Sequence, residues 1–390
     1  MSVSEAPARP PVPAQGSEPP RRADAIVIGA GHNGLVAANY LADAGLDVVV
    51  LERRPEVGGM TRSGYAIPEA PDHLINHCAV DPIFWPASRP AQDFELHRFG
   101  LRWVNVDPAF VYLHPEGESV AFWHDPRRTA EDMRRFSRSD AQSFLEFAAL
   151  TKATADIVLP MFAANPTRPH FEALLAAARA AVKHRRRVPD IAALLFASGR
   201  EVIAERFEHP VVRSAMHMAS ASLYPSSFPG STIQMLILEF VHRFGCLRPV
   251  GGTRRIPDAL EARLHSRGGT VLTDAQVAHI TTAANRATGV TLTDGRELRA
   301  SRAILASCDP RQALTELLPP GTLEPQLSRR AAAIPVNGLG WGQLKVDIAC
   351  SGRLDLGRFE SERADGANLR AASHWIGTED GIERAYRRAA

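Results

Sequence analysis

Three glycines and one glutamate near the start of the chain could hold a dinucleotide. Gly29, Gly31 and Gly34 form a G-x-G-x-x-G pattern directly after a short β-branched run. Gly29 would permit a tight turn, Gly31 would let backbone N–H groups approach a pyrophosphate, and Gly34 would let a helix pack closely on a strand. Glu52 could accept hydrogen bonds from a ribose diol. A phosphate on that ribose would be repelled by the carboxylate.

The elements around these residues have the order that a nucleotide site needs. The apolar run Ala25–Ile28 predicts a strand, and the apolar periodicity after Asn33 predicts a helix with Gly45 at its end. Val48–Leu51 predicts a second buried strand, which completes a βαβ unit. The N-terminus of the helix, where His32 and Asn33 lie, would hold the phosphates.

A second glycine pair distinguishes two classes of cofactor. Gly58 and Gly59 follow Glu52 closely and are followed by Met60, Thr61 and Arg62. This segment, which begins with Glu52 and Arg53, resembles an extension in flavoproteins of the glutathione reductase superfamily. In those proteins a second turn packs along the pyrophosphate and ribityl chain of FAD. We therefore expect FAD rather than NAD, with Arg62 able to pair with a phosphate oxygen.

The composition is that of a globular protein, apart from a tail. The chain has 390 residues, 45% hydrophobic and 23% charged, and a net charge of +2, which does not indicate nucleic acid as a partner. Residues 1–22 are rich in proline and predict a disordered tail without the apolar core of a secretory signal. No apolar run is long enough to span a bilayer, so we expect a cytoplasmic protein.

Other chemistries have weak support. The four cysteines are scattered without a C-x-x-C pair, which argues against a disulfide reductase. His73 and His77 could be metal ligands one helical turn apart, but packing or surface roles are commoner for such a pair, and we predict no metal site. No Ser/His/Asp arrangement is evident, so no catalytic residue is assigned.

A second block, residues 247–312, has the pattern of the other half of a cofactor domain. A helix is expected over Ile256–Arg267 and a strand over Thr270–Thr273. Short strands follow on both sides of the Asp294–Gly295 turn, among them Glu297–Leu298, and Ser301–Ala306 predicts a further buried strand.

Together these blocks resemble the phytoene desaturase-like flavoproteins, most closely the branch of pyridine nucleotide-disulfide oxidoreductase domain 2. The resemblance implies an α/β fold: a Rossmann-like FAD-binding domain of the glutathione reductase superfamily type, with an inserted, mainly helical or mixed substrate domain. It implies cofactor segments 23–74 and 247–312, substrate segments 75–246 and 313–390, and Val277 with its backbone against adenine. Better-known relatives act on carotenoid and retinoid polyenes. Family members normally continue past this chain's end with a glycine-rich turn that closes over the flavin ring, and we expect that closing segment to be absent and FAD retention to be weakened.

The middle of the chain suggests a substrate and a surface. Aromatic residues could line a site for a long hydrophobic substrate, although core packing is commoner: Trp85, Phe122, Trp123, Phe162, Phe171, Tyr224 and Phe228. The stretch Ile191–Phe207 is expected to form one amphipathic run, and Ser139–Gln142 to cap the helix before Phe144. An apolar stripe from Phe171 to Val182 precedes five basic residues. This segment is either a peripheral membrane contact or a domain helix with a solvated basic end.

The function predicted from the sequence is FAD-dependent oxidation of a long, polyene-like molecule. Two alternatives stay open at this stage. One is a flavoprotein-fold binding protein like the Rab GDP-dissociation inhibitors, and the other is an amine oxidase of the same superfamily. The sequence leaves the oligomeric state open.

Overall fold

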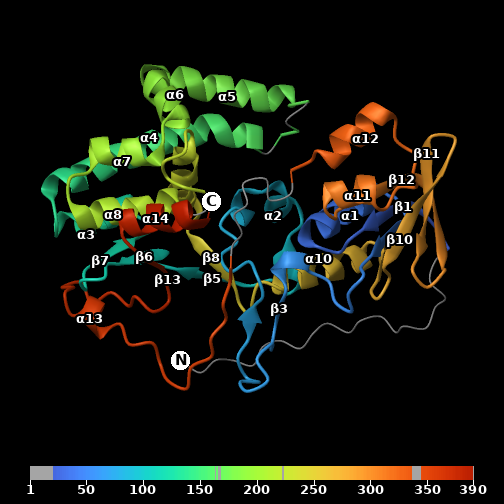
Figure 1. The fold of residues 1–390 in the computed structure, drawn as a ribbon, viewed down its shortest axis with the longest axis horizontal. Coiled ribbons are helices and arrows are strands. Elements are labelled where there is room, and N and C mark those ends of the chain that lie inside the picture. The colour runs from blue at the N-terminus through green and yellow to red at the C-terminus, as the bar shows by residue number, and fades with distance from the viewer. Residues whose placement is uncertain (1–20, 163, 166–167, 222–223, 336–343, 390) are drawn as a thin grey trace. The chain divides into compact units, whose positions relative to one another are not determined.

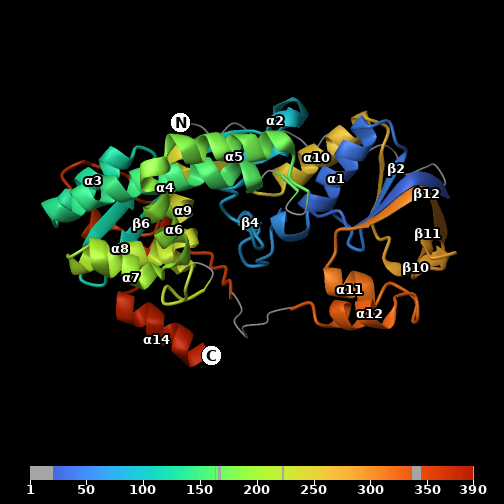
Figure 2. The same cartoon turned by 90° about the horizontal axis from the view of Figure 1, so that it is seen from above.

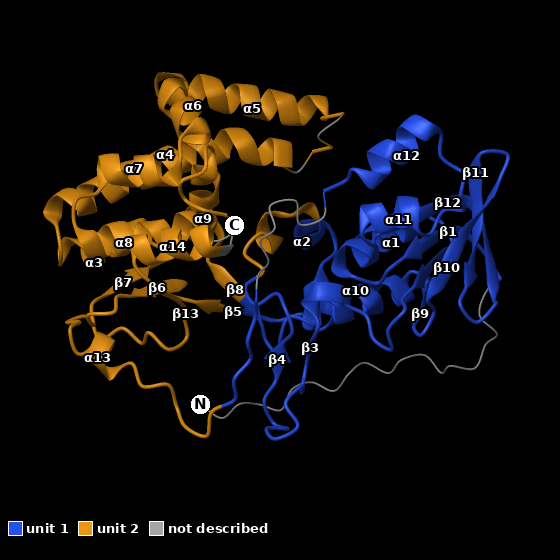
Figure 3. Cartoon of the chain, in the orientation of Figure 1, with its two compact units in different colours: residues 1–81, 90–104, 248–349 blue, residues 82–89, 105–247, 350–390 orange. Residues whose placement is uncertain are grey.

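Each of the two units of the chain is built around its own sheet (Figure 3). The computed structural model describes residues 21–389 except 163, 166–167, 222–223 and 336–343. Unit 1 comprises the described residues of 1–81, 90–104 and 248–349, and unit 2 those of 82–89, 105–247 and 350–390. The boundaries at 104/105 and 247/248 fall within two short strands, β5 (Trp103–Val106) and β8 (Cys246–Pro249).

A six-stranded sheet forms the centre of unit 1, in the order β10-β11-β12-β1-β2-β9 (Figure 1). From β12 to β9 the neighbours are parallel, whereas β10, β11 and β12 are antiparallel. Ile28 pairs with Leu51, so β1 and β2 end at the same level. The strands are β1 (Arg22–Ile28), β2 (Val48–Leu51), β9 (Thr270–Leu272), β10 (Val277–Ala283), β11 (Arg286–Leu292) and β12 (Glu297–Ala306).

Helices cover both faces of this sheet. Figure 2 shows α1 and α10 on one side and α11 and α12 on the other. Asn39 of α1 is fully buried and joins α1 to α10, because its amide donates to the Leu260 carbonyl (2.9 Å) and accepts from Arg263 (3.0 Å). The helices are α1 (His32–Asp43), α10 (Arg255–Ser266), α11 (Pro310–Thr315) and α12 (Pro325–Ala332); the smaller elements are β3 (Ser63–Gly64), β4 (Ile75–Asn76) and α2 (Arg89–Asp93).

The predicted α/β fold is confirmed, with two local differences. Strand β1 begins at Arg22, which pairs with Arg299, and the carbonyl of Arg21 accepts the N–H of Arg299 (3.0 Å), so the expected tail is wrong at its last two residues. Residues 1–20 of the tail lie outside the described residues. Strand β12 is one continuous strand where two were expected. It is continuous because Leu298 in its first half pairs with β11, while its second half pairs with β1.

The compact units also differ from the expected domain boundaries. The described residues of 313–349 lie in unit 1, although the expected boundaries place them in the substrate domain. Leu317 explains this placement, since it packs against the sheet core and its carbonyl accepts the N–H of Ile280 (2.7 Å). That the units serve as cofactor and substrate domains stays a prediction.

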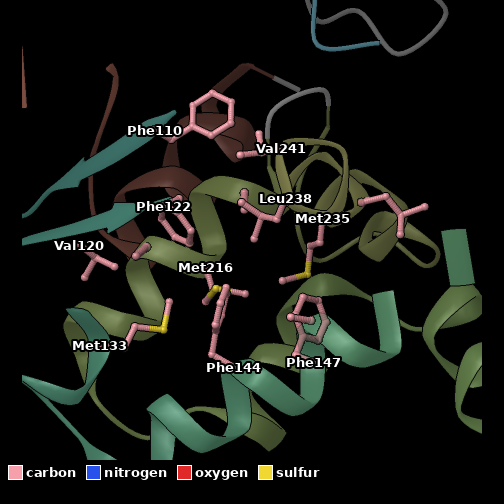
Figure 4. Packing of buried hydrophobic residues seen from close by; sticks show 14 of the residues in the cluster. Phe110, Val120, Phe122, Met133, Phe144, Phe147, Met216, Met235, Leu238 and Val241 are labelled. Atoms are coloured by element: carbon pink, nitrogen blue, oxygen red, sulfur yellow. The ribbon is translucent and has the colours of Figure 1, made fainter. Parts of the chain in front are cut away.

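Unit 2 packs helices against a three-stranded sheet in the order β13-β6-β7. A large apolar cluster forms its core, in which Phe122 of β7 lies among Phe144, Met216 and Leu238 from the helices (Figure 4). The elements are β6 (Phe110–Leu113), β7 (Ser119–Phe122), β13 (Ser373–Ile376), α3 (Pro126–Arg134), α4 (Arg138–Phe162), α5 (Phe171–Lys183), α6 (Val188–Phe196), α7 (Gly199–Arg206), α8 (Pro210–Ser220), α9 (Leu236–Phe244), α13 (Gly357–Glu360) and α14 (Glu379–Ala389). None of the described helices is both long and apolar enough to cross a bilayer.

Two helix expectations in unit 2 are wrong. The run Ile191–Phe207 forms two helices, because Ser198 and Glu201 make a reciprocal capping box that starts α7. Helix α4 begins before the expected cap, since the hydroxyl of Ser137 accepts the N–H of Asp140 (3.0 Å). The buried carboxylate of Asp140 instead accepts two successive backbone N–H groups just before α8 (2.9 Å each).

Candidate functional site

A cavity of about 560 Å³ opens in unit 1 where β12, β1 and β2 end. In open parallel sheets, ligands bind outside the carboxyl ends of the strands. Ten of the predicted residues line this cavity: Gly29, Gly31, His32, Asn33, Glu52, Arg53, Gly59, Met60, Arg62 and Val277. The other predicted residues, Gly34, Gly58 and Thr61, are not among the lining residues.

The first glycine turn is built for close approach to backbone. Gly29 has φ +99°, a conformation that other residues rarely adopt. A Cβ on Gly34 would overlap the carbonyl oxygen of Gly29, so only glycine lets α1 begin this close to β1. Gly31 differs, because it has an extended backbone and a Cβ there would meet only the Cα of Gly59, at 4.0 Å. The fold therefore tolerates a side chain at Gly31, but that side chain would fill part of the cavity that Gly31 lines.

The second glycine pair packs on the first turn. Gly58 donates to the Ala30 carbonyl (2.8 Å) and forms a parallel bridge with Gly31. Gly58 and Gly59 have φ values of +121° and +56°, and a Cβ on Gly59 would lie 3.1 Å from the Cα of Gly31. The hydroxyl of Thr61 donates to the Gly58 carbonyl (2.6 Å) and holds the turn. The two turns thus form one wall of backbone without side chains.

Glu52 supplies a fixed carboxylate at the end of β2. It is only 7% exposed. Its Oε2 accepts the N–H of Ala30 (2.9 Å) and its Oε1 accepts the N–H of Arg54 (3.0 Å). Each carboxylate oxygen can accept a further hydrogen bond, so the group remains able to bind a diol in the cavity.

The guanidinium of Arg62 lines the cavity but already has partners. It pairs with Glu56 (3.0 Å) and donates to the Gly59 carbonyl (3.2 Å). A phosphate at this position would compete with the Glu56 carboxylate, which the sequence pattern did not reveal.

Backbone donors at the start of α1 could hold an anion in the cavity. The first N–H groups of α1 have no partner within the helix, and the positive end of the helix dipole lies with them. Burial lowers the pKa of His32 at this helix start, which favours the neutral ring. The donors, the glycine wall and the acceptor Glu52 together fit a dinucleotide, with the diphosphate at α1 and a ribose diol at Glu52.

Several lining residues were missed by the sequence analysis. Ser307, Cys308 and Asp309 follow β12, and Gln276 precedes β10. The available signal was topological: β12 is the parallel neighbour of β1, so the residues after both strands meet at one edge. His77 and Cys78 also line the cavity. The expected spacing of one helical turn between His73 and His77 is wrong, because the chain between them forms the short strand β4 and no helix.

Comparisons with known proteins agree with this geometry. The family described as flavin containing amine oxidoreductase matches residues 34–346. Pyridine nucleotide-disulfide oxidoreductase domain-containing protein 2 of Mus musculus is 29% identical over 350 residues, which cover 80% of this chain and 58% of the relative. The lycopene-forming phytoene desaturase of Pantoea ananas is 24% identical over 297 residues, which cover 75% of this chain and 57% of the desaturase.

A solved structure has the same fold. An oxidoreductase from Methanosarcina mazei superposes with a TM-score of 0.52 at 19% identity, over 79% of this chain and 63% of that one. The chain spans 58% of the mouse relative's length and 57% of the desaturase's length.

Proposed function

The chain belongs to the flavin-containing amine oxidoreductase family of FAD-dependent enzymes. We propose that it is an oxidoreductase acting on a long, apolar, polyene-like molecule. The observation that carries the proposal is the glycine-walled cavity with Glu52 at its end. FAD is the cofactor of this family, and bound FAD would supply two-electron redox chemistry.

The residues of the cavity would divide the work of holding FAD. The N–H groups at the start of α1 and the wall formed by Gly31 and Gly59 would bind the pyrophosphate. Glu52 would bind the ribose of the adenosine half, and the backbone at Val277 would lie against adenine. These contacts orient the cofactor along the strand ends and leave the redox step to the flavin.

The proposed substrate class rests on the relatives. One is named a phytoene desaturase, and its substrate is a hydrophobic small molecule. The aromatic residues of unit 2 give limited support, because Phe122 and Trp123 are buried in packed cores while Phe162 and Phe171 are exposed. We assign no catalytic residue, and we propose peripheral membrane contact as the means of reaching such a substrate.

The description of the family supports a second candidate, the oxidation of an amine. The two candidates differ in what must reduce the flavin. Membership of a family of enzymes favours both over the Rab GDP-dissociation inhibitor-like alternative, in which flavin would serve no catalytic purpose.

The test is to add each candidate substrate to the FAD-loaded protein without oxygen and to monitor flavin reduction by the loss of flavin absorbance. A C40 polyene in detergent should bleach the flavin, and a primary amine should not. Bleaching by the amine alone would support the amine oxidase candidate instead. If a visible spectrum and release of the bound cofactor revealed no flavin after FAD loading, the proposed function would fail.

A further inference from the structure

Helix α5 presents its larger apolar side chains to solvent. Phe171, Leu174 and Val182 are 76%, 47% and 67% exposed. These positions recur at the spacing of one helical stripe, which Ala178 continues. In a globular domain such a stripe normally faces the core.

The packed side of α5 is made mostly of alanine. Its half-buried positions are Ala173, Leu175, Ala177, Ala180 and Ala181, and no residue of α5 is fully buried. Figure 2 shows α5 running alongside α4, which is the helix that this alanine side contacts. Three of the four larger apolar residues of this amphipathic helix, Phe171, Leu174 and Val182, therefore face outward, and Leu175 is half-buried. Phe162 at the end of α4 and Phe196 at the end of α6 are exposed as well.

Positive charge accompanies this exposed stripe. Arg179 and Lys183 lie on α5, and Arg185, Arg186 and Arg187 follow it after His184. Glu172 is the one carboxylate on the helix. Lys183 lies 3.4 Å from Asp156, but no described carboxylate is within ion-pair distance of the three consecutive arginines. The arginines are exposed and free to meet negative charge from outside the chain.

We propose that α5 and residues 185–187, together called the α5 surface, dock on an anionic lipid bilayer. The apolar stripe would enter the boundary between headgroups and acyl chains, and the arginines would meet lipid phosphates. Helix α5 has 13 residues, about 20 Å at 1.5 Å per residue, so it would lie in the plane of the interface. Charge complementarity selects a bilayer over a second copy of this chain, whose same surface would repel it.

This inference deepens the proposed function, because a membrane is where a long apolar substrate dissolves. It is measured separately from turnover. Lipid binding without any redox activity would support the docking proposal although the proposed function failed. Redox activity without lipid binding would refute the docking proposal.

The experiment is sedimentation of the 390-residue protein with sucrose-loaded vesicles. Vesicles of phosphatidylcholine that contain about 30 mol% phosphatidylglycerol should bind the protein. Vesicles of pure phosphatidylcholine should bind it far more weakly. Binding should weaken as salt rises, because the Debye length shortens from about 10 Å at 0.1 M to about 3 Å at 1 M.

Matched variants locate the surface. Leu174→Asp should lower vesicle affinity at least roughly tenfold, since it removes apolar area that would be buried in the bilayer and adds a negative charge. Leu327→Asp on α12 is the control, because Leu327 has the same 47% exposure. The pair Arg185→Gln and Arg186→Gln should cost roughly 25-fold, at about fivefold for each charge. The control pair Arg329→Gln and Arg330→Gln on α12 should change little.

Three results would overturn the proposal. The first is equal binding to neutral and anionic vesicles. The second is an equal loss in the α5 and α12 variants, each checked for folding by circular dichroism. The third is a dimer in analytical ultracentrifugation that Leu174→Asp dissociates, which would make the α5 surface an interface between copies.

Discussion

The two glycines of the first turn should separate cofactor binding from folding. Gly31→Ala adds a methyl group whose nearest atom outside the adjoining residues is the Cα of Gly59 at 4.0 Å, and its backbone is extended. Gly34→Ala adds the same methyl group against the carbonyl oxygen of Gly29 and 3.1 Å from Ser307. The methyl group of Gly31→Ala would enter the cavity, whereas the methyl group of Gly34→Ala would overlap atoms of the packed protein.

The magnitudes follow from these distances. Gly31→Ala should leave the free energy of unfolding within about 0.5 kcal/mol of the parent. It should weaken FAD binding by about 3 kcal/mol, on the order of 100-fold, if it displaces two N–H···phosphate hydrogen bonds of about 1.5 kcal/mol each. Gly34→Ala should lower the free energy of unfolding by about 1–3 kcal/mol or more through overpacking.

Two measurements on each variant decide the matter. Urea denaturation without flavin gives the stability, and titration of FAD followed by fluorescence quenching gives the affinity. Gly31→Ala with parental FAD affinity would refute the assignment of this wall to the pyrophosphate. Gly34→Ala with parental stability would refute the packing argument.

Further predictions concern the carboxylate, the buried histidine and the thiols. Glu52→Gln should weaken FAD by about 1.5–3 kcal/mol through the ribose contacts, while FMN, which has no adenosine, should bind unchanged; titrations with both flavins check this, and an equal loss would contradict it. Burial lowers the pKa of His217 below its ordinary 6.5, against the opposing effect of Glu379. The unfolded chain then binds more protons, so the free energy of unfolding should fall as the pH drops below about 6.5. His217→Gln should flatten this dependence in urea midpoints measured from pH 7.5 to 5, and an unchanged slope would assign it to other groups. Burial raises the pKa of Cys308 and keeps it a thiol; Cys78→Ser with Cys308→Ser should retain flavin reduction by substrate, and its loss in a folded, FAD-loaded variant would indicate thiol chemistry.

Local patterns were sufficient for the core of the site. A β-branched run, a G-x-G-x-x-G turn, an apolar helix and a second strand ending at Glu52 are contiguous in sequence, and each has few alternative structures. The predicted strands Ala25–Ile28 and Val48–Leu51 both occur, and the second lies in the sheet as expected. The cofactor class also followed from a short segment, the pair Gly58 and Gly59. The sequence by itself therefore determined the first βαβ unit of the fold.

Contacts between distant segments were decided only by the tertiary structure. Ser307 and Cys308 line the cavity because β12 pairs with β1, from which it is separated by about 280 residues of chain. The Glu56 carboxylate beside Arg62 depends on how the turn closes, since salt-bridge geometry has no signature in residue type alone. The clearest case is the rotation of α5 about its own axis, which decides which of its faces packs against the protein. Its sequence has an apolar stripe and an alanine stripe, and both could face a core. Packing against α4 selected the alanine stripe, because small side chains allow close approach of two helices, and this left Phe171 and Val182 in solvent.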